Sequence, residues 1–172
     1  MTFDYGIYDY VGLPRYYSLR CNPSYITRDL AQTIYSSYIE RNEAQKDALT
    51  EMIKAGKRLY FVEALNPTLP DSIIMGYSSK QMQWAENYEA DVWAALVGNN
   101  MLYSNTKDNF RALFGDGPFT QAFSNDAPAR LGEYLGLQII RSYMTNNDVS
   151  LQEMIRNNDI QQIFQASQYK PK

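Results

Sequence analysis

Apolar residues recur at helical spacing along most of the chain, and this pattern is the strongest constraint on the fold. Ile26, Leu30, Ile34 and Tyr38 follow one another every four residues, which predicts a helix whose apolar stripe faces a core. No segment shows the sustained apolar–polar alternation of a half-buried strand. At 172 residues and 45% apolar, the chain can bury one ordinary core. The sequence therefore predicts an all-α fold, with one helical domain over residues 1–172.

Turn and capping residues divide this domain into elements. Residues 1–21 are predicted to be an irregular, tyrosine-rich lead-in, residues 68–77 a connection, and residues 167–172 an exposed tail. Helices are predicted to begin at Asn22–Pro23, at about residue 43, at Ser78 or Ser79, at Asp126–Pro128 and at Asp148–Ser150, with a short helix between 104 and 126. The second is predicted to end at Asn66–Pro67 and the third at Gly98.

Three glycines fall inside predicted helices, where glycine costs about 1 kcal/mol relative to alanine. Gly56 has two interpretations: close packing by another backbone or a ligand, or an indifferent position. Gly132 and Gly136 lie one turn apart beside charged residues, which favours close helix packing in a soluble core over a dimerising membrane span.

Histidine is absent and Cys21 is the only cysteine, which excludes most templates for hydrolytic chemistry. An HExxH zinc helix, a nucleophile activated by imidazole, a multi-cysteine metal site and an internal disulfide are all ruled out. The net charge of −3, with acids and bases interspersed, argues against a nucleic-acid partner. No apolar stretch approaches the roughly 20 residues that span a bilayer, and no signal peptide precedes Cys21. We expect no catalytic residues, cofactor or metal.

Acidic and aromatic residues leave further alternatives open. Glu86 and Glu89 lie three residues apart near Trp84 and Trp93, and a solvated helix face is favoured over a glycosidase-like acid pair. The 15 tyrosines fit amphipathic wall positions, with the ring buried and the hydroxyl at the boundary. Alternatively they form a surface that binds sugar or peptide.

A series of short motifs is more specific in combination than any one alone. In order they are Gly56–Lys57, Tyr60–Phe61, Pro70–Asp71, Gly76–Tyr77, Trp84 with Glu89 and Trp93, Leu102–Ser104, Arg130 with Gly132, and residues 167–172. Together they resemble the gliding-motility lipoprotein B (GldB) family of Bacteroidetes. The resemblance covers nearly the whole chain and corresponds to the C-terminal half of a typical member, which begins with a lipoprotein signal.

That family is distantly similar to predicted zinc peptidases, so the resemblance implies the C-terminal helical half of a zincin-like metallopeptidase. Where those proteins carry a glutamate before glycine, this chain has Ala55–Gly56, and the third expected metal ligand is missing. The resemblance thus implies a non-catalytic protein, with a degenerate or fragmentary zinc metallopeptidase as an alternative.

The family resemblance also implies a place in the cell envelope, either periplasmic or anchored through a lipid that this chain does not carry. It implies a role in gliding and associated protein secretion, through contacts with envelope or secretion-machinery proteins. A module that binds peptide or glycan is the other alternative.

Six residues combine a family match with side chains able to do more than fill space. This candidate interaction surface comprises Lys57, Tyr77, Glu89, Trp93, Arg130 and Arg141. Each also has a structural interpretation. The two arginines could pair with Glu133 or with Glu86 and Glu89, and Trp93 lies on an apolar stripe.

Overall fold

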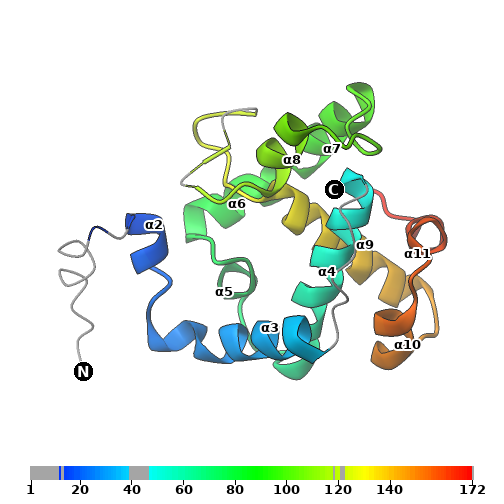
Figure 1. The fold of residues 1–172 in the computed structure, drawn as a ribbon, viewed down its shortest axis with the longest axis horizontal. Helices are drawn as coiled ribbons and strands as arrows, with labels where there is room; N and C mark the ends of the chain where they lie inside the picture. The colour runs from blue at the N-terminus through cyan, green and yellow to red at the C-terminus, as the bar shows by residue number, and fades with distance from the viewer. Residues whose placement is uncertain (1–11, 13, 39–46, 118, 121–122, 172) are drawn as a thin grey trace.

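A computed structural model describes residues 12, 14–38, 47–117, 119–120 and 123–171, and it confirms the all-α prediction (Figure 1). Within those residues the chain forms helices and loops, with no strand. In order the helices are α2 (Arg15–Ser18), the 3-10 turn η1 (Pro23–Tyr25), α3 (Ile26–Tyr38), α4 (Ala48–Leu65), α5 (Asp71–Met75), α6 (Ser79–Asn87), α7 (Glu89–Gly98), α8 (Lys107–Phe114), α9 (Leu131–Asn146), α10 (Leu151–Arg156) and α11 (Ile160–Ser167). None of these helices is long and apolar enough to cross a membrane.

The long helices α4 and α9 cross at the centre of the core, and glycine makes the crossing possible. A Cβ atom added to Gly56 would collide with the backbone carbonyl of Gly136. One added to Gly136 would collide with the backbone of Met52, and one added to Gly132 would lie 2.6 Å from the Phe114 ring. The prediction of close packing at Gly132 and Gly136 is therefore confirmed, and of the two interpretations of Gly56 the structure shows close packing by another backbone.

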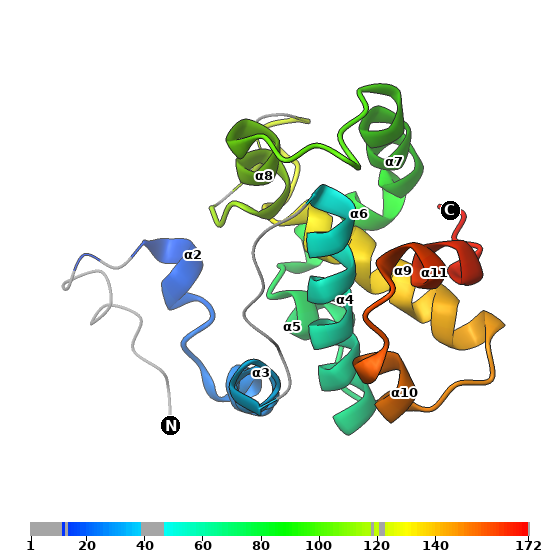
Figure 2. The same cartoon turned by 45° about the vertical axis from the view of Figure 1, so that its right-hand side comes forward.

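The remaining helices surround this central pair. Helix α3 packs on one side of α4, whereas α10 and α11 lie on the other side, against α4 and α9 (Figure 2). The buried side chains form one cluster that draws on both halves of the chain, including Leu49, Met52, Leu135, Ile139 and Ile163.

Helix boundaries follow the capping residues in the sequence. Ser78 and Ser150 each begin a helix through a reciprocal capping box, with Gln81 and Glu153 respectively. Asp47 caps α4 by accepting a hydrogen bond from the Thr50 amide at 2.7 Å. Gly76 ends α5 in the left-handed conformation, with φ of 70°, which a residue with a Cβ rarely adopts.

The predicted buried stripe of α3 is wrong. Ile26, Leu30, Ile34 and Tyr38 are exposed at 63%, 60%, 39% and 86%, and the neighbouring stripe of Arg28, Ala31 and Tyr35 is buried instead. The small side chain of Ala31 permits a close approach to α4, and the Tyr35 ring packs on Phe61 with centroids 5.5 Å apart. Because Ala31 and Tyr35 give α3 apolar side chains on a second face, the fit to α4 decides which face is buried.

Two predicted helices are each divided in two. The third predicted helix breaks at Tyr88 into α6 and α7, and the Tyr88 side chain is exposed. The last predicted helix breaks after Arg156 into α10 and α11, where Asp159 caps the second piece. The predicted connection over residues 68–77 contains the short helix α5.

Helix α9 begins later than predicted. Thr120 holds the preceding segment as a loop, since its amide donates to the carbonyl of Ala127 and its hydroxyl to that of Pro128. The helix starts only after Arg130, whose φ is 59°.

The chain after α11 is not the predicted exposed tail. Ser167 is fully buried and the Tyr169 ring packs against the core. The predicted start of the second helix at residue 43, and most of the lead-in over residues 1–21, lie outside the described residues.

We predict that Gly136→Ala lowers the free energy of unfolding by about 2 kcal/mol or more, because the added methyl group must separate α4 from α9. Chemical denaturation followed by circular dichroism measures this difference. Gly98→Ala is the matched control, since its added Cβ meets nothing within 4 Å and helix propensity favours alanine. Equal effects of the two substitutions would contradict the close-packing argument.

Candidate functional site

The six residues of the candidate interaction surface lie in separate parts of the molecule. Lys57, Tyr77 and Glu89 are at most 6% exposed, so the set does not form a continuous exposed surface. Tyr77 and Arg130 line one cleft, and Glu89 and Trp93 share contacts with Tyr169. Lys57 and Arg141 lie apart from both groups, and each connects its own helix to other segments through hydrogen bonds.

Lys57 ties α4 to the connection between α10 and α11. Its Nζ donates a hydrogen bond to the backbone carbonyl of Asn157. Burial disfavours the charged amine and lowers the pKa of Lys57 to about 8. The side chain thus links two segments that are 100 residues apart in the sequence. Because the amine is buried there, it loses its proton more easily than an exposed lysine does.

Glu89 is a buried carboxylate held by two tyrosines. It accepts hydrogen bonds from the hydroxyls of Tyr134 and Tyr169, each at 2.8 Å. Burial, together with the Glu89 charge and hydrogen bond, raises the pKa of both tyrosines. Trp93 packs edge-on against the Tyr169 ring, with centroids 5.0 Å apart.

This arrangement corrects the expectation for the two glutamates. Glu86 is exposed on α6, whereas Glu89 is the first residue of α7 and points into the core. The break at Tyr88 separates them, so they form neither one solvated face nor an acid pair.

Arg141 joins three helices through carboxylates other than those predicted. Its Nη1 and Nη2 donate to the two oxygens of Asp71 at 2.7 and 2.6 Å, and its Nε donates to Glu63 at 2.9 Å. Burial opposes the guanidinium charge, but the hydrogen bonds to Asp71 and Glu63 outweigh it and raise the pKa of Arg141. The predicted pairing of Arg141 with Glu86 or Glu89 is wrong.

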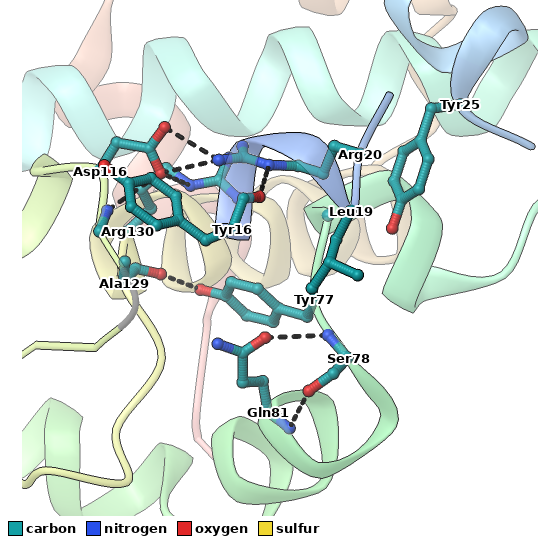
Figure 3. A pocket seen from close by; sticks show the side chains of 12 residues that line it. Tyr16, Leu19, Arg20, Tyr25, Tyr77, Ser78, Gln81, Asp116, Ala129 and Arg130 are labelled. Atoms are coloured by element: carbon teal, nitrogen blue, oxygen red, sulfur yellow. Dashed lines mark hydrogen bonds and ion pairs between the residues drawn. The ribbon is translucent and has the colours of Figure 1, made fainter. Parts of the chain in front are cut away.

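A cleft of about 550 Å³, which we call the arginine cleft, lies between the α2–η1 segment and the turn that joins α5 to α6 (Figure 3). Its lining mixes aromatic, aliphatic and charged side chains: Tyr16, Leu19, Arg20, Tyr25, Gly76, Tyr77, Ser78, Gln81, Asp116, Gly117, Ala129 and Arg130. Tyr77 forms part of the inner wall, and its hydroxyl donates to the carbonyl of Ala129 at 2.6 Å. Burial raises the pKa of Tyr77.

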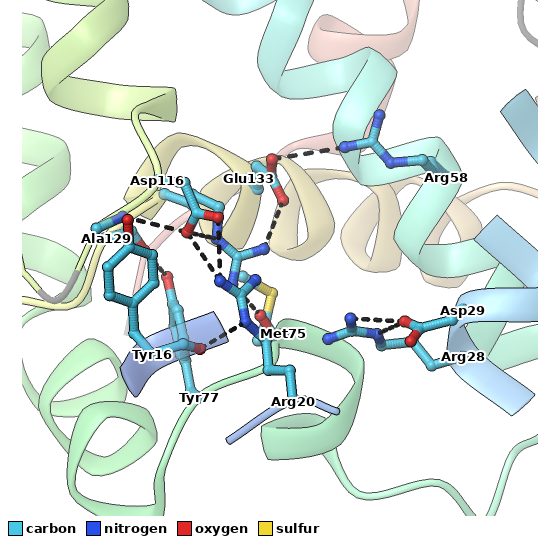
Figure 4. A network of polar contacts seen from close by, with 12 residues as sticks. Tyr16, Arg20, Arg28, Asp29, Arg58, Met75, Tyr77, Asp116, Ala129 and Glu133 are labelled. Atoms are coloured by element: carbon cyan, nitrogen blue, oxygen red, sulfur yellow. Dashed lines mark hydrogen bonds and ion pairs between the residues drawn. The ribbon is translucent and has the colours of Figure 1, made fainter. Parts of the chain in front are cut away.

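Asp116 and two arginines form the charged part of the cleft (Figure 4). Arg20 Nη2 donates to both Asp116 oxygens, at 3.1 and 3.0 Å, and Arg130 Nε lies 3.6 Å from one of them. Burial raises the pKa of Asp116, but the Arg20 hydrogen bond and both guanidinium charges outweigh it, so the pKa is lowered. The carboxylate is therefore ionised at neutral pH.

Further contacts fix Arg130 in place. Its Nη2 donates to the carbonyl of Met75 at 2.6 Å, and its Nη1 lies 3.5 Å from a Glu133 oxygen. The pairing of Arg130 with Glu133 is one of the two that the sequence analysis considered. Glu133 in turn pairs with Arg58 at 3.5 Å.

The missing side chain of Gly76 leaves room for three arginines. A Cβ atom there would lie 2.6 Å from Arg28 Nη1, 2.9 Å from Arg20 Cδ and 3.3 Å from Arg130 Nη2. Gly76 and Arg130 both belong to motifs recognised in the sequence. Arg20 and Asp116 were not predicted, because they meet across 96 residues and neither lies in a recognised motif.

The described residues include no group of three or more cysteine, aspartate or glutamate side chains placed to hold a metal ion. Aromatic and aliphatic walls beside a pair of guanidinium groups, as in the arginine cleft, are features of sites that bind ligands.

Comparison with protein families assigns the chain by its sequence. The family model described as gliding motility protein GldB matches residues 1–171. Comparisons with curated proteins and with solved structures find no match.

The lowered pKa of Lys57 predicts how stability depends on pH. Between about pH 8 and its ordinary pKa of 10.5, the unfolded lysine binds a proton that the folded one has lost, so stability rises with pH. We expect the free energy of unfolding, relative to Lys57→Met, to rise by about 1–2 kcal/mol between about pH 7 and about pH 9.5. Urea denaturation of both proteins across this pH range measures the difference between their free energies of unfolding. If that difference does not change with pH, the pKa of Lys57 is not lowered by burial.

Proposed function

Because the chain belongs to the family of gliding motility protein GldB, we propose that it is a non-catalytic cell-envelope protein that supports gliding and associated protein secretion. It acts through contacts with other envelope or secretion-machinery proteins. The arginine cleft is the contact site.

The lining of the cleft is the observation that supports a contact role. Tyr16, Leu19 and Tyr25 supply apolar surface next to the guanidinium of Arg20. Leu19 is 49% exposed, so this surface is open to a partner. Tyrosine and arginine are enriched among the residues that carry most of the binding energy at protein interfaces. A segment of a partner chain fits such a cleft better than a flat surface does.

The protonation states of the cleft support a non-catalytic role. Tyr77 has a raised pKa and a committed hydroxyl, while Asp116 has a lowered pKa and is paired with Arg20. A general acid or base works best with a pKa near the operating pH, and neither group is in that range.

The family assignment favours the cell envelope as the place of action, and a lipid anchor would hold the protein at the membrane. Metabolic labelling of the native host with radioactive palmitate is expected to label the full-length protein. Recovery of unlabelled protein in the soluble periplasmic fraction would favour the periplasmic alternative.

Site-specific crosslinking in the native host tests the contact role. We expect a photo-crosslinking amino acid at Leu19 of the full-length protein to capture a discrete envelope or secretion-machinery protein. We also expect Leu19→Glu to reduce both this crosslink and colony spreading, because a charge then replaces an apolar wall of the cleft.

Tyr103 provides the matched control, since it is 59% exposed and does not line the cleft. The crosslinker at Tyr103 should not capture the same protein, and Tyr103→Glu should leave spreading unchanged. Identical crosslinks from both positions, or none from Leu19 with spreading intact in Leu19→Glu, would rule out the cleft as the contact site.

A further inference from the structure

We propose that the arginine cleft binds a carboxylate group of an acidic partner segment, in the position that Asp116 occupies between Arg20 and Arg130. This inference rests on the proposed function, because it names the chemistry of the partner contact. Asp116 then acts as an internal substitute that the partner displaces.

The position already holds a carboxylate, although with incomplete geometry. Of the Arg20 nitrogens only Nη2 donates to the Asp116 oxygens, whereas two parallel bonds from two nitrogens make the strongest arginine–carboxylate pair. The carboxylate also accepts from the Gly117 amide at 3.1 Å and is hydrogen-bonded to Tyr17, and a ligand that displaces it must replace these contacts. Arg20 Nε is directed elsewhere, to the backbone carbonyl of Tyr16 at 3.1 Å. A carboxylate that approaches from the open cleft is not restricted by the short side chain of Asp116.

Arg130 supplies a donor that Asp116 does not satisfy. Its Nε is buried and, within the described residues, has no hydrogen-bond partner, since the nearest Asp116 oxygen is 3.6 Å away. Buried donors without acceptors are rare and destabilising. Contacts to Met75 and Glu133 hold the guanidinium in place, so a ligand oxygen slightly closer than Asp116 would complete the site without moving Arg130.

Asp116 has both the freedom and the space to leave. It follows the end of α8 and lies between Gly115 and Gly117, and its side chain is 28% exposed. It also borders a second cavity of about 400 Å³, which Asp108 and Arg111 line. On rotating into that cavity, the Asp116 carboxylate would share the Arg111 cation with the Asp108 carboxylate.

Charge balance favours an anionic ligand. Among the described residues, Asp116 is the one acidic side chain that lines the arginine cleft, against Arg20 and Arg130. Once Asp116 turns away, Arg20 loses its carboxylate partner, while Arg130 keeps only its pairing with Glu133, which lies outside the cleft lining. Tyr16, Leu19 and Tyr25 then receive the apolar atoms next to the ligand's acid group.

Titrations followed by NMR of arginine Nε–H groups test this proposal on the 172-residue chain. The probes are N-acetylglutamate amide, which carries a side-chain carboxylate, N-acetylalanine, which carries a main-chain carboxylate, and the neutral N-acetylglutamine amide. In Asp116→Asn, which keeps the shape and removes the charge, we expect a carboxylate probe to shift the Arg130 Nε–H signal saturably. The wild type should need about tenfold more of it, and Arg20→Gln in the Asp116→Asn background should weaken binding about tenfold.

The two carboxylate probes distinguish an acidic side chain from a chain terminus as the source, according to which one binds more tightly. The Arg130→Lys variant lacks the Arg130 Nε–H group, so the signal that disappears from its spectrum is the one that belongs to Arg130. An equal shift with the neutral probe, or no shift with either carboxylate in folded Asp116→Asn, would overturn the proposal. Tighter binding of inorganic phosphate than of either carboxylate would overturn the choice of carboxylate.

The crosslinking and titration experiments can fail separately. A crosslink from Leu19 without carboxylate binding would leave the proposed contact in place and reject its acidic chemistry. Carboxylate binding without a crosslink would support the site and reject its role in partner contact.

Discussion

The direct contact of α4 and α9 through their backbones is the constraint on which the rest of the structure depends. Gly56 and Gly136 bring the two helices so close that no side chain fits between them at the crossing. The other helices then pack around a fixed pair, with α3 on one side and α10 and α11 on the other. This contact leaves no gap that could absorb added atoms, so a larger side chain at either glycine must separate the two helices.

Polar ties attach the outer segments to this pair, and they also shape the arginine cleft. Arg141 connects α9 to Asp71 and Glu63, and Glu89 holds Tyr169 after the last helix. On the opposite side, Arg20 reaches Asp116 and thereby closes the α2–η1 segment over the turn at Gly76. The Arg20 guanidinium thus pairs with Asp116 within the fold and also lines the open arginine cleft.

Local signals in the sequence predicted much of the fold, whereas long-range pairing was not predictable. Ser78 and Ser150 mark helix starts because a capping box involves only neighbouring residues. By contrast, the buried face of α3 depends on how Ala31 and Tyr35 fit α4, and periodicity alone selected the wrong stripe. For the same reason the motifs pointed to Tyr77 and Arg130, but Asp116 and Arg20 emerged only when the fold brought them together.

The contrast between the central crossing and the α2–η1 segment implies two levels of local stability. Amide protons where α4 meets α9 can exchange with solvent only when the two helices separate, which amounts to global unfolding. The α2–η1 segment instead borders an open cavity and is tied across it through the Arg20–Asp116 pair, so it can open while the core stays intact. We therefore expect one wall of the cleft to open as a separate, weaker cooperative unit, and an occupant of the cleft to slow hydrogen exchange there first.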